Sequence, residues 1–148
     1  MQQDVSAPTP SCLSEHRLAE AAERRSLPAT WRCVPVGPDK VPLIRDWPHK
    51  ATADRGTWRT WLGWPRAALA LLTGPESGTL VIDCDRRPGL DGLEALAELE
   101  AELGPLPPTA TAATPSGGQH TFYAWPNHVE RIPSRPIRPG LDCKASSG

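Results

Sequence analysis

The chain has 148 residues, 39% of them hydrophobic, and a formal net charge of −1 at pH 7. This length suffices for one domain with a buried core, and the balanced charge argues against nonspecific nucleic-acid binding through bulk charge. No cationic start precedes an apolar stretch and no apolar run could span a bilayer, so we expect a cytoplasmic protein with no membrane segment. The cysteines form no C-x-x-C pair, which gives a zinc site little support and favours reduced thiols.

The N-terminal region predicts a tail followed by short elements. Residues 1–12 are polar and contain proline, so we expect a disordered tail ahead of a domain over 13–148. A helix is expected over residues 14–26, with Ser14 as its N-cap. Residues 31–36 favour a short strand, and the proline within it is typical of an edge or irregular strand.

Residues 37–53 are expected to form a loop that carries three cations, Lys40, Arg45 and Lys50, and the aromatic Trp47. Cations interleaved with an aromatic ring are suited to contacts with the phosphates and bases of a nucleic-acid template. The alternative is a solvated loop whose tryptophan fills the core, and these residues alone favour that alternative.

The next segment predicts a helix that begins after Asp54. Trp58, Trp61 and Leu62 fall at i, i+3 and i+4 and form an apolar stripe. We interpret this stripe as core rather than as a stacking platform. An apolar strand is expected over residues 67–73.

Two aspartates stand at the end of a strongly apolar strand over residues 79–85. Asp83 and Asp85 are two positions apart and therefore point to the same side of the strand, about 7 Å apart along the chain. Like charges in a largely buried place need a positive partner, and a divalent metal is the common partner of hard oxygen ligands. The alternative is that the aspartates end the strand and pair with arginines of the turn over 86–89.

A helix follows this turn. Asp91 and Glu94 have the spacing of a capping box, the leucines up to Leu103 follow helical periodicity, and Gly104 ends the helix. We then expect a strand over 109–114, a turn over 115–118, a strand over 119–125, a proline-rich connector over 126–140 and the start of a strand over 141–144.

Polar residues at the ends of these strands suggest phosphoryl chemistry. The Ser116-Gly117-Gly118 turn can direct backbone N–H groups at a phosphate, and His120 can donate to a phosphate oxygen. Asp142 adds a carboxylate on a later strand. Each of these has a plainer alternative, since such a turn is often only a hairpin and a single histidine is often structural.

Several short motifs occur in a fixed order along the chain. They are Lys40-Val41-Pro42-Leu43, Trp47, Ala51-Thr52, Asp54, Thr73-Gly74, Val81-Ile82-Asp83-Cys84-Asp85, Gly104-Pro105-Leu106-Pro107, Thr114-Pro115-Ser116-Gly117-Gly118-Gln119-His120 and Gly140-Leu141-Asp142. Together they closely resemble the bifunctional DNA primase/polymerase N-terminal domain of the archaeo-eukaryotic primase superfamily. This resemblance implies an α/β (α+β) fold, a single domain with a mainly antiparallel, RRM-like catalytic sheet flanked by helices.

The resemblance also implies roles for individual residues. Asp83, Asp85 and Asp142 correspond to the ligands of two catalytic metal ions, Mg²⁺ or Mn²⁺, and His120 lies near the incoming triphosphate. The turn residues Ser116, Gly117 and Gly118 belong to the same nucleotide-binding motif. Lys144 is expected to neutralise phosphate charge where relatives carry an arginine, as a point charge without the bidentate geometry of arginine.

The implied activity is template-directed nucleotidyl transfer by a DNA primase and polymerase in the replication of a phage, plasmid or mobile element. Its partners are a single-stranded DNA template, an NTP or dNTP, and a replicative helicase on a separate chain or in a missing C-terminal region. Relatives continue past the third motif into a further strand, so we expect a C-terminally truncated domain. Two alternatives stay open: an inactive nucleotide- or DNA-binding remnant, and a metal-dependent phosphodiesterase or nuclease.

Overall fold

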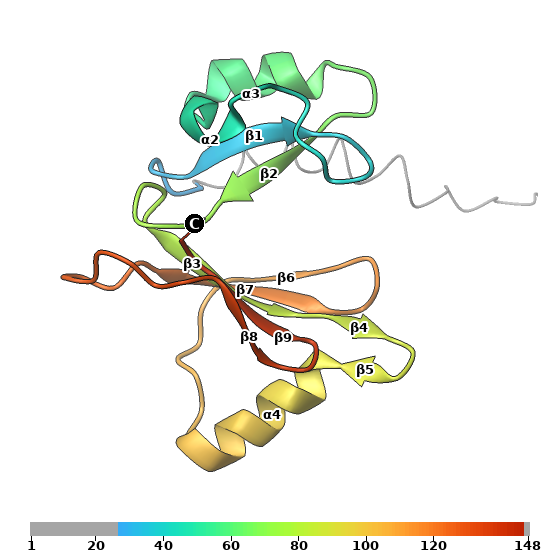
Figure 1. The fold of residues 1–148 in the computed structure, drawn as a ribbon, viewed down its shortest axis with the longest axis vertical. Helices are drawn as coiled ribbons and strands as arrows, with labels where there is room; N and C mark the ends of the chain where they lie inside the picture. The colour runs from blue at the N-terminus through green and yellow to red at the C-terminus, as the bar shows by residue number, and fades with distance from the viewer. Residues whose placement is uncertain (1–26, 147–148) are drawn as a thin grey trace, which may run out of the picture. The chain divides into compact units, whose positions relative to one another are not determined.

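The computed structural model describes residues 27–146, so the expected tail and the helix over 14–26 lie outside the described residues. The chain divides into two compact units, one ending at Leu71 and the other beginning at Leu72. The first contains β1 (Arg32–Val36), α2 (Trp47–Lys50), α3 (Arg55–Leu62) and all but the last residue of β2 (Ala68–Leu72). The second contains β3 (Thr79–Cys84), β4 (Arg86–Arg87), β5 (Leu90–Asp91), α4 (Gly92–Leu103), β6 (Thr111–Ala113), β7 (Gln119–Ala124), β8 (Arg135–Arg138) and β9 (Leu141–Lys144) (Figure 1). None of the helices between residues 27 and 146 has the length and apolar character of a membrane span.

The first unit pairs β1 with β2 and covers its core with α3. The Asp54 carboxylate accepts a hydrogen bond from the Thr57 backbone N–H at 2.7 Å, which confirms the predicted cap of this helix. Trp58 and Trp61 are buried beside Cys33, so the predicted apolar stripe belongs to the core. The prediction of a continuous loop before this helix is wrong, because it contains the short helix α2.

The second unit is built on a five-stranded sheet in the order β6-β7-β3-β9-β8. Every neighbouring pair in it is antiparallel. The apolar, β-branched sequence of β3 suits its central position, where strands pair on both sides. The expected α+β class with a mainly antiparallel sheet is therefore confirmed.

Helix α4 covers one face of this sheet. The predicted cap is confirmed, since the Asp91 carboxylate accepts hydrogen bonds from the N–H groups of the first turn. The helix contacts β3 and β9, and its Glu100 lies near enough to Cys84 and Tyr123 to raise the pKa of both, after burial as the main cause. Because side chains alternate along a strand, Asp83 faces away from the side that carries Cys84 and the helix.

The prediction of a connector over residues 126–140 is wrong in part, because this segment contains strand β8. The proline in this strand, Pro136, is tolerated because β8 is an edge strand and needs no full ladder of donors. Arg138, the last residue of the strand, forms ion pairs with Glu98 at 3.4 Å and Glu102 at 2.7 Å, both on α4. These contacts link the edge of the sheet to the helix.

The end of β3 is held by a close approach of three backbone segments. The Asp85 N–H donates to the Gly140 carbonyl at 2.8 Å, and the Gly92 N–H donates to the Asp85 carbonyl at 2.8 Å. A Cβ atom on Gly92 would lie only 2.0 Å from the Gly140 carbonyl oxygen. Glycine is required here by space, and this packing fixes the backbone of Asp85.

We expect Gly92→Ala to lower the free energy of unfolding by about 3 kcal/mol, because backbone must move to admit the methyl group. Gly89→Ala is the matched control, since a Cβ there meets nothing within 4 Å and only the positive φ of 78° opposes it. Its expected cost is about 1 kcal/mol. Urea unfolding of both variants measures the difference, and equal costs would contradict the packing argument.

Candidate active site

The register of the central strands places three predicted site residues side by side. Asp83 on β3 lies opposite His120 on β7 and, on its other side, opposite Asp142 on β9. Residues directly opposite each other in an antiparallel pair share a face of the sheet. The sheet therefore gathers these side chains on the face that α4 does not cover.

Close polar contacts connect these side chains to one another and to Lys144. His120 Nε2 lies 3.2 Å from Asp83 Oδ1, and Lys144 Nζ lies 2.6 Å from Asp142 Oδ2 and 3.9 Å from Asp83 Oδ2. Lys144 is opposite Val81 in the register and so reaches Asp83 diagonally. The pKa of Lys144 is raised, mainly by its hydrogen bond to Asp142 and further by the charges of Asp142, Asp83 and Asp85.

One carboxylate oxygen in this cluster lacks a hydrogen bond. The Asp83 side chain is only 14% exposed, and its buried Oδ1 has no hydrogen-bond partner within residues 27–146, although His120 Nε2 lies 3.2 Å away. A buried acceptor without a donor is costly unless a cation or water meets it. Among the atoms of this cluster, Asp83 Oδ1 therefore gives the strongest indication that a cation binds here.

Asp85 lies one residue beyond the end of β3 and is exposed. Its side chain makes no hydrogen bond or ion pair with residues 27–146, although its backbone is fixed by two hydrogen bonds. Arg86 instead pairs with Asp91, through Nε and Oδ2 at 2.9 Å. The alternative that Asp83 and Asp85 pair with the arginines of the following turn is therefore wrong.

The turn between β6 and β7 is pressed against the same end of β3. A Cβ atom on Gly118 would lie 2.2 Å from the Cys84 carbonyl oxygen, and Gly117 has a positive φ of 85°. The backbone N–H groups of Ser116 and Gly118 make no hydrogen bond within the described part of the chain. Such free donors in a glycine turn are suited to an anion.

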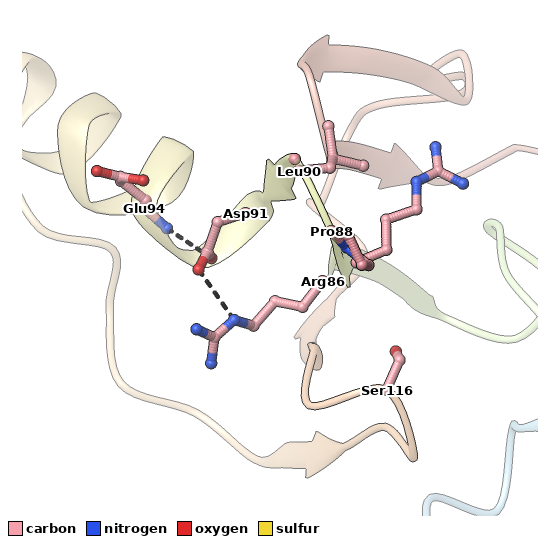
Figure 2. A pocket seen from close by; sticks show the side chains of 8 residues that line it. Arg86, Pro88, Leu90, Asp91, Glu94 and Ser116 are labelled. Carbon is pink, nitrogen blue, oxygen red and sulfur yellow. Dashed lines mark hydrogen bonds and ion pairs between the residues drawn. The ribbon is translucent and has the colours of Figure 1, made fainter.

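A cavity of about 550 Å³ opens between this turn and the β4–β5 hairpin. Figure 2 shows Ser116 on the turn, across from Arg86, and Asp91 bonded to both Arg86 and the backbone of Glu94. The lining residues are Arg86, Arg87, Pro88, Gly89, Leu90, Asp91, Glu94 and Ser116. The two arginines were not predicted as site residues. Their position directly after the acidic pair was the available signal, but only the fold places them opposite Ser116.

The three cations predicted to contact the template lie in the first unit. Lys40 and Arg45 are on the segment between β1 and α2, Lys50 ends α2, and all three are exposed. They are not among the residues that the five-stranded sheet brings together. Their role in template binding stays a prediction.

The carboxylates suit a divalent metal in chemistry and charge. Hard oxygen ligands are what Mg²⁺ and Mn²⁺ prefer, and Asp83 Oδ1 is buried without a hydrogen bond from the described part of the chain. Within residues 27–146, no three His, Cys, Asp or Glu side chains converge in a ligating arrangement. The Lys144 ammonium lies between Asp83 and Asp142, so a positive group already stands where the two carboxylates meet.

The fold and the cluster define an α+β protein with acidic side chains and a histidine on an antiparallel sheet, beside a turn suited to phosphate. The family model described as "Bifunctional DNA primase/polymerase, N-terminal" matches residues 24–148. The chain belongs to this family. No curated protein and no solved structure matches the chain.

The Lys144–Asp142 pair should make stability depend on alkaline pH. Because the folded state holds the Lys144 proton more tightly than the unfolded chain, the pair stabilises the fold fully below about pH 10.4 and loses this effect as the pH rises through the raised pKa. The half-exposed lysine limits the contribution to about 0.5 kcal/mol.

The sharper measurement is an NMR titration of Lys144 Nζ. We expect its pKa to fall in Asp142→Asn, which removes the charge of the hydrogen-bonded partner at 2.6 Å. Glu130→Gln, which changes an exposed carboxylate of the same unit, should leave the pKa unchanged. An identical Lys144 pKa in the wild type and Asp142→Asn would contradict the pairing.

Proposed function

We propose that this chain catalyses template-directed nucleotidyl transfer, as a DNA primase and polymerase that uses Mg²⁺ or Mn²⁺. The observation that supports it best is the register, which places Asp83 between His120 and Asp142 in a chain of the primase/polymerase family. Carboxylates supply metal ligands, and a histidine beside them can donate to a phosphate oxygen. Transfer of a nucleotidyl group needs metal ligands and a donor to the phosphate oxygens within one site.

The residues of the cluster have different roles in this proposal, according to their chemistry. Asp83, Asp85 and Asp142 would hold the metal ions, which would activate the 3′-hydroxyl of the primer and neutralise the pyrophosphate leaving group. His120 would donate to an oxygen of the triphosphate, from a position fixed by strand β7 and by its edge-to-face contact with Phe122. Lys144, whose ammonium lies 2.6 Å from Asp142 and 3.9 Å from Asp83, would neutralise negative charge of the triphosphate.

The turn beside β3 would receive the triphosphate. Ser116 and Gly118 have free backbone N–H groups, and Gly118 brings the turn against the end of the strand that carries Asp83. The nucleotide-binding role of Ser116, Gly117 and Gly118 is part of this proposal. A single-stranded DNA template is part of the same proposal. A partner helicase and replication of a phage, plasmid or mobile element stay expectations from the family resemblance.

Primer extension tests the reaction. On a single-stranded template with NTPs or dNTPs and Mn²⁺, we expect the wild type to extend a primer and Asp83→Asn to lose at least about 100-fold in rate, because a metal ligand is removed. Glu130→Gln, an exposed position outside the cluster, should extend like the wild type. Equal extension by Asp83→Asn would overturn the catalytic assignment.

The same assay distinguishes the rival functions. Nucleotide binding by the wild type without any extension would replace the proposal with a non-catalytic nucleotide- or DNA-binding protein. Degradation of the template in place of extension would identify a metal-dependent phosphodiesterase or nuclease, which could use the same carboxylates.

Metal binding can be tested without activity. We expect Mn²⁺ at about 100 times its Kd to stabilise the wild type by about 2.7 kcal/mol, since it binds the folded state. Asp83→Asn should lose most of this stabilisation, and Glu130→Gln should keep it. Thermal unfolding with and without Mn²⁺ measures the effect, and equal stabilisation of Asp83→Asn would exclude this residue as a ligand.

A further inference from the structure

We propose that the cavity between the β4–β5 hairpin and the Ser116 turn binds a phosphodiester group of the nucleic-acid strand, with Arg87 as its cationic contact. This inference rests on the proposed function and deepens it, because it assigns a place for the strand to residues outside the carboxylate cluster.

Arg87 is the cation of this cavity that is free to bind a ligand. Its side chain is exposed and makes no hydrogen bond or ion pair with residues 27–146, while its backbone pairs with Leu90 in the hairpin. Arg86 is already neutralised by Asp91, although only its Nε is used in that contact. An arginine without a partner at the wall of a cavity is well suited to a phosphate, which its planar fork can hold through two hydrogen bonds.

The opposite wall supplies a neutral donor. Ser116 carries a hydroxyl 3.1 Å from Thr114 Oγ1, and this hydroxyl is distinct from the backbone N–H that the proposed function assigns to the triphosphate. Phosphate in nucleic-acid complexes is commonly held by such hydroxyl and backbone donors together with arginine. The two walls therefore offer one cation and one hydroxyl group to the same ligand.

The charge of the lining favours a phosphodiester over a triphosphate. Arg86 and Arg87 are balanced by Asp91 and Glu94, so the formal charges around the cavity cancel. A phosphodiester adds one negative charge per phosphate, which Arg87 can match. A triphosphate would concentrate several negative charges next to Glu94.

The position of the cavity suits a strand that ends at the carboxylate cluster. Arg87 follows Asp85 by two residues, a distance of about 7 Å along an extended chain. Most of the lining is exposed, including Arg87, Gly89 and Ser116, so a continuous strand could enter and leave. A strand whose reacting end lies at the carboxylates would thus bring a nearby phosphate to Arg87.

Fluorescence anisotropy with labelled oligothymidylate, without metal or nucleotide, tests this assignment across a series of salt concentrations. We expect Arg87→Ala to weaken binding about fivefold at 0.1 M salt and to reduce the slope of log K against log salt by about 0.7, the loss of one phosphate contact on a single strand. Arg87→Lys should restore the slope, since it keeps the charge. Arg131→Ala, which removes an exposed arginine of the same unit outside the cavity, should bind like the wild type.

Three results of the anisotropy experiment would overturn the inference. They are an unchanged slope in Arg87→Ala, an equal loss in Arg131→Ala, and wild-type protein that does not bind the oligonucleotide. Weaker binding of ATP by Arg87→Ala with unchanged DNA binding would also overturn it and would assign the cavity to the triphosphate. Primer extension judges the proposed function separately, because a protein that extends primers normally but shows no dependence on Arg87 refutes only this inference.

Discussion

The pairing of β3 with β7 on one side and with β9 on the other is the constraint on which the candidate site depends. It puts Asp83 opposite both His120 and Asp142, and a slip of one residue in either pairing would send one partner to the opposite face. The opposite face resists such a slip, because Cys84 and Leu141 face each other there without exposure to solvent. Core packing on one face therefore specifies the polar geometry on the other.

This arrangement concentrates negative charge on a partly buried surface. Asp83 and Asp142 share one ammonium, Lys144, and Asp85 stands close enough to add to its field. Removing that ammonium would leave His120 Nε2, at 3.2 Å, as the remaining ion-pair partner of Asp83 among the described residues. A bound metal ion would therefore compete with Lys144 for the same two carboxylates.

Local patterns in the sequence predicted the elements that carry the site better than the contacts between them. The apolar run before Asp83 and the cap at Asp91 are determined within a few residues, so β3 and α4 were predictable. The register depends on contacts between distant segments, and the edge strand β8 was missed because Pro136 argues locally against a strand. The position of Arg87 was likewise not predictable from local sequence, since it lies opposite Ser116 only because Gly118 approaches β3.

The two glycines at the end of β3 explain how a small sheet can hold both parts of such a site. Gly118 lets one turn touch the Cys84 carbonyl, and Gly92 lets helix α4 begin against the backbone of Asp85. Carboxylates and phosphate donors are thereby attached to one rigid point, without an intervening flexible segment. Phosphoryl chemistry needs its groups held to within about 0.5 Å, which strands and close backbone contacts achieve better than loops. The same point carries the β4–β5 hairpin, so a strand bound at Arg87 would be positioned relative to the carboxylates by the same contacts that position the turn.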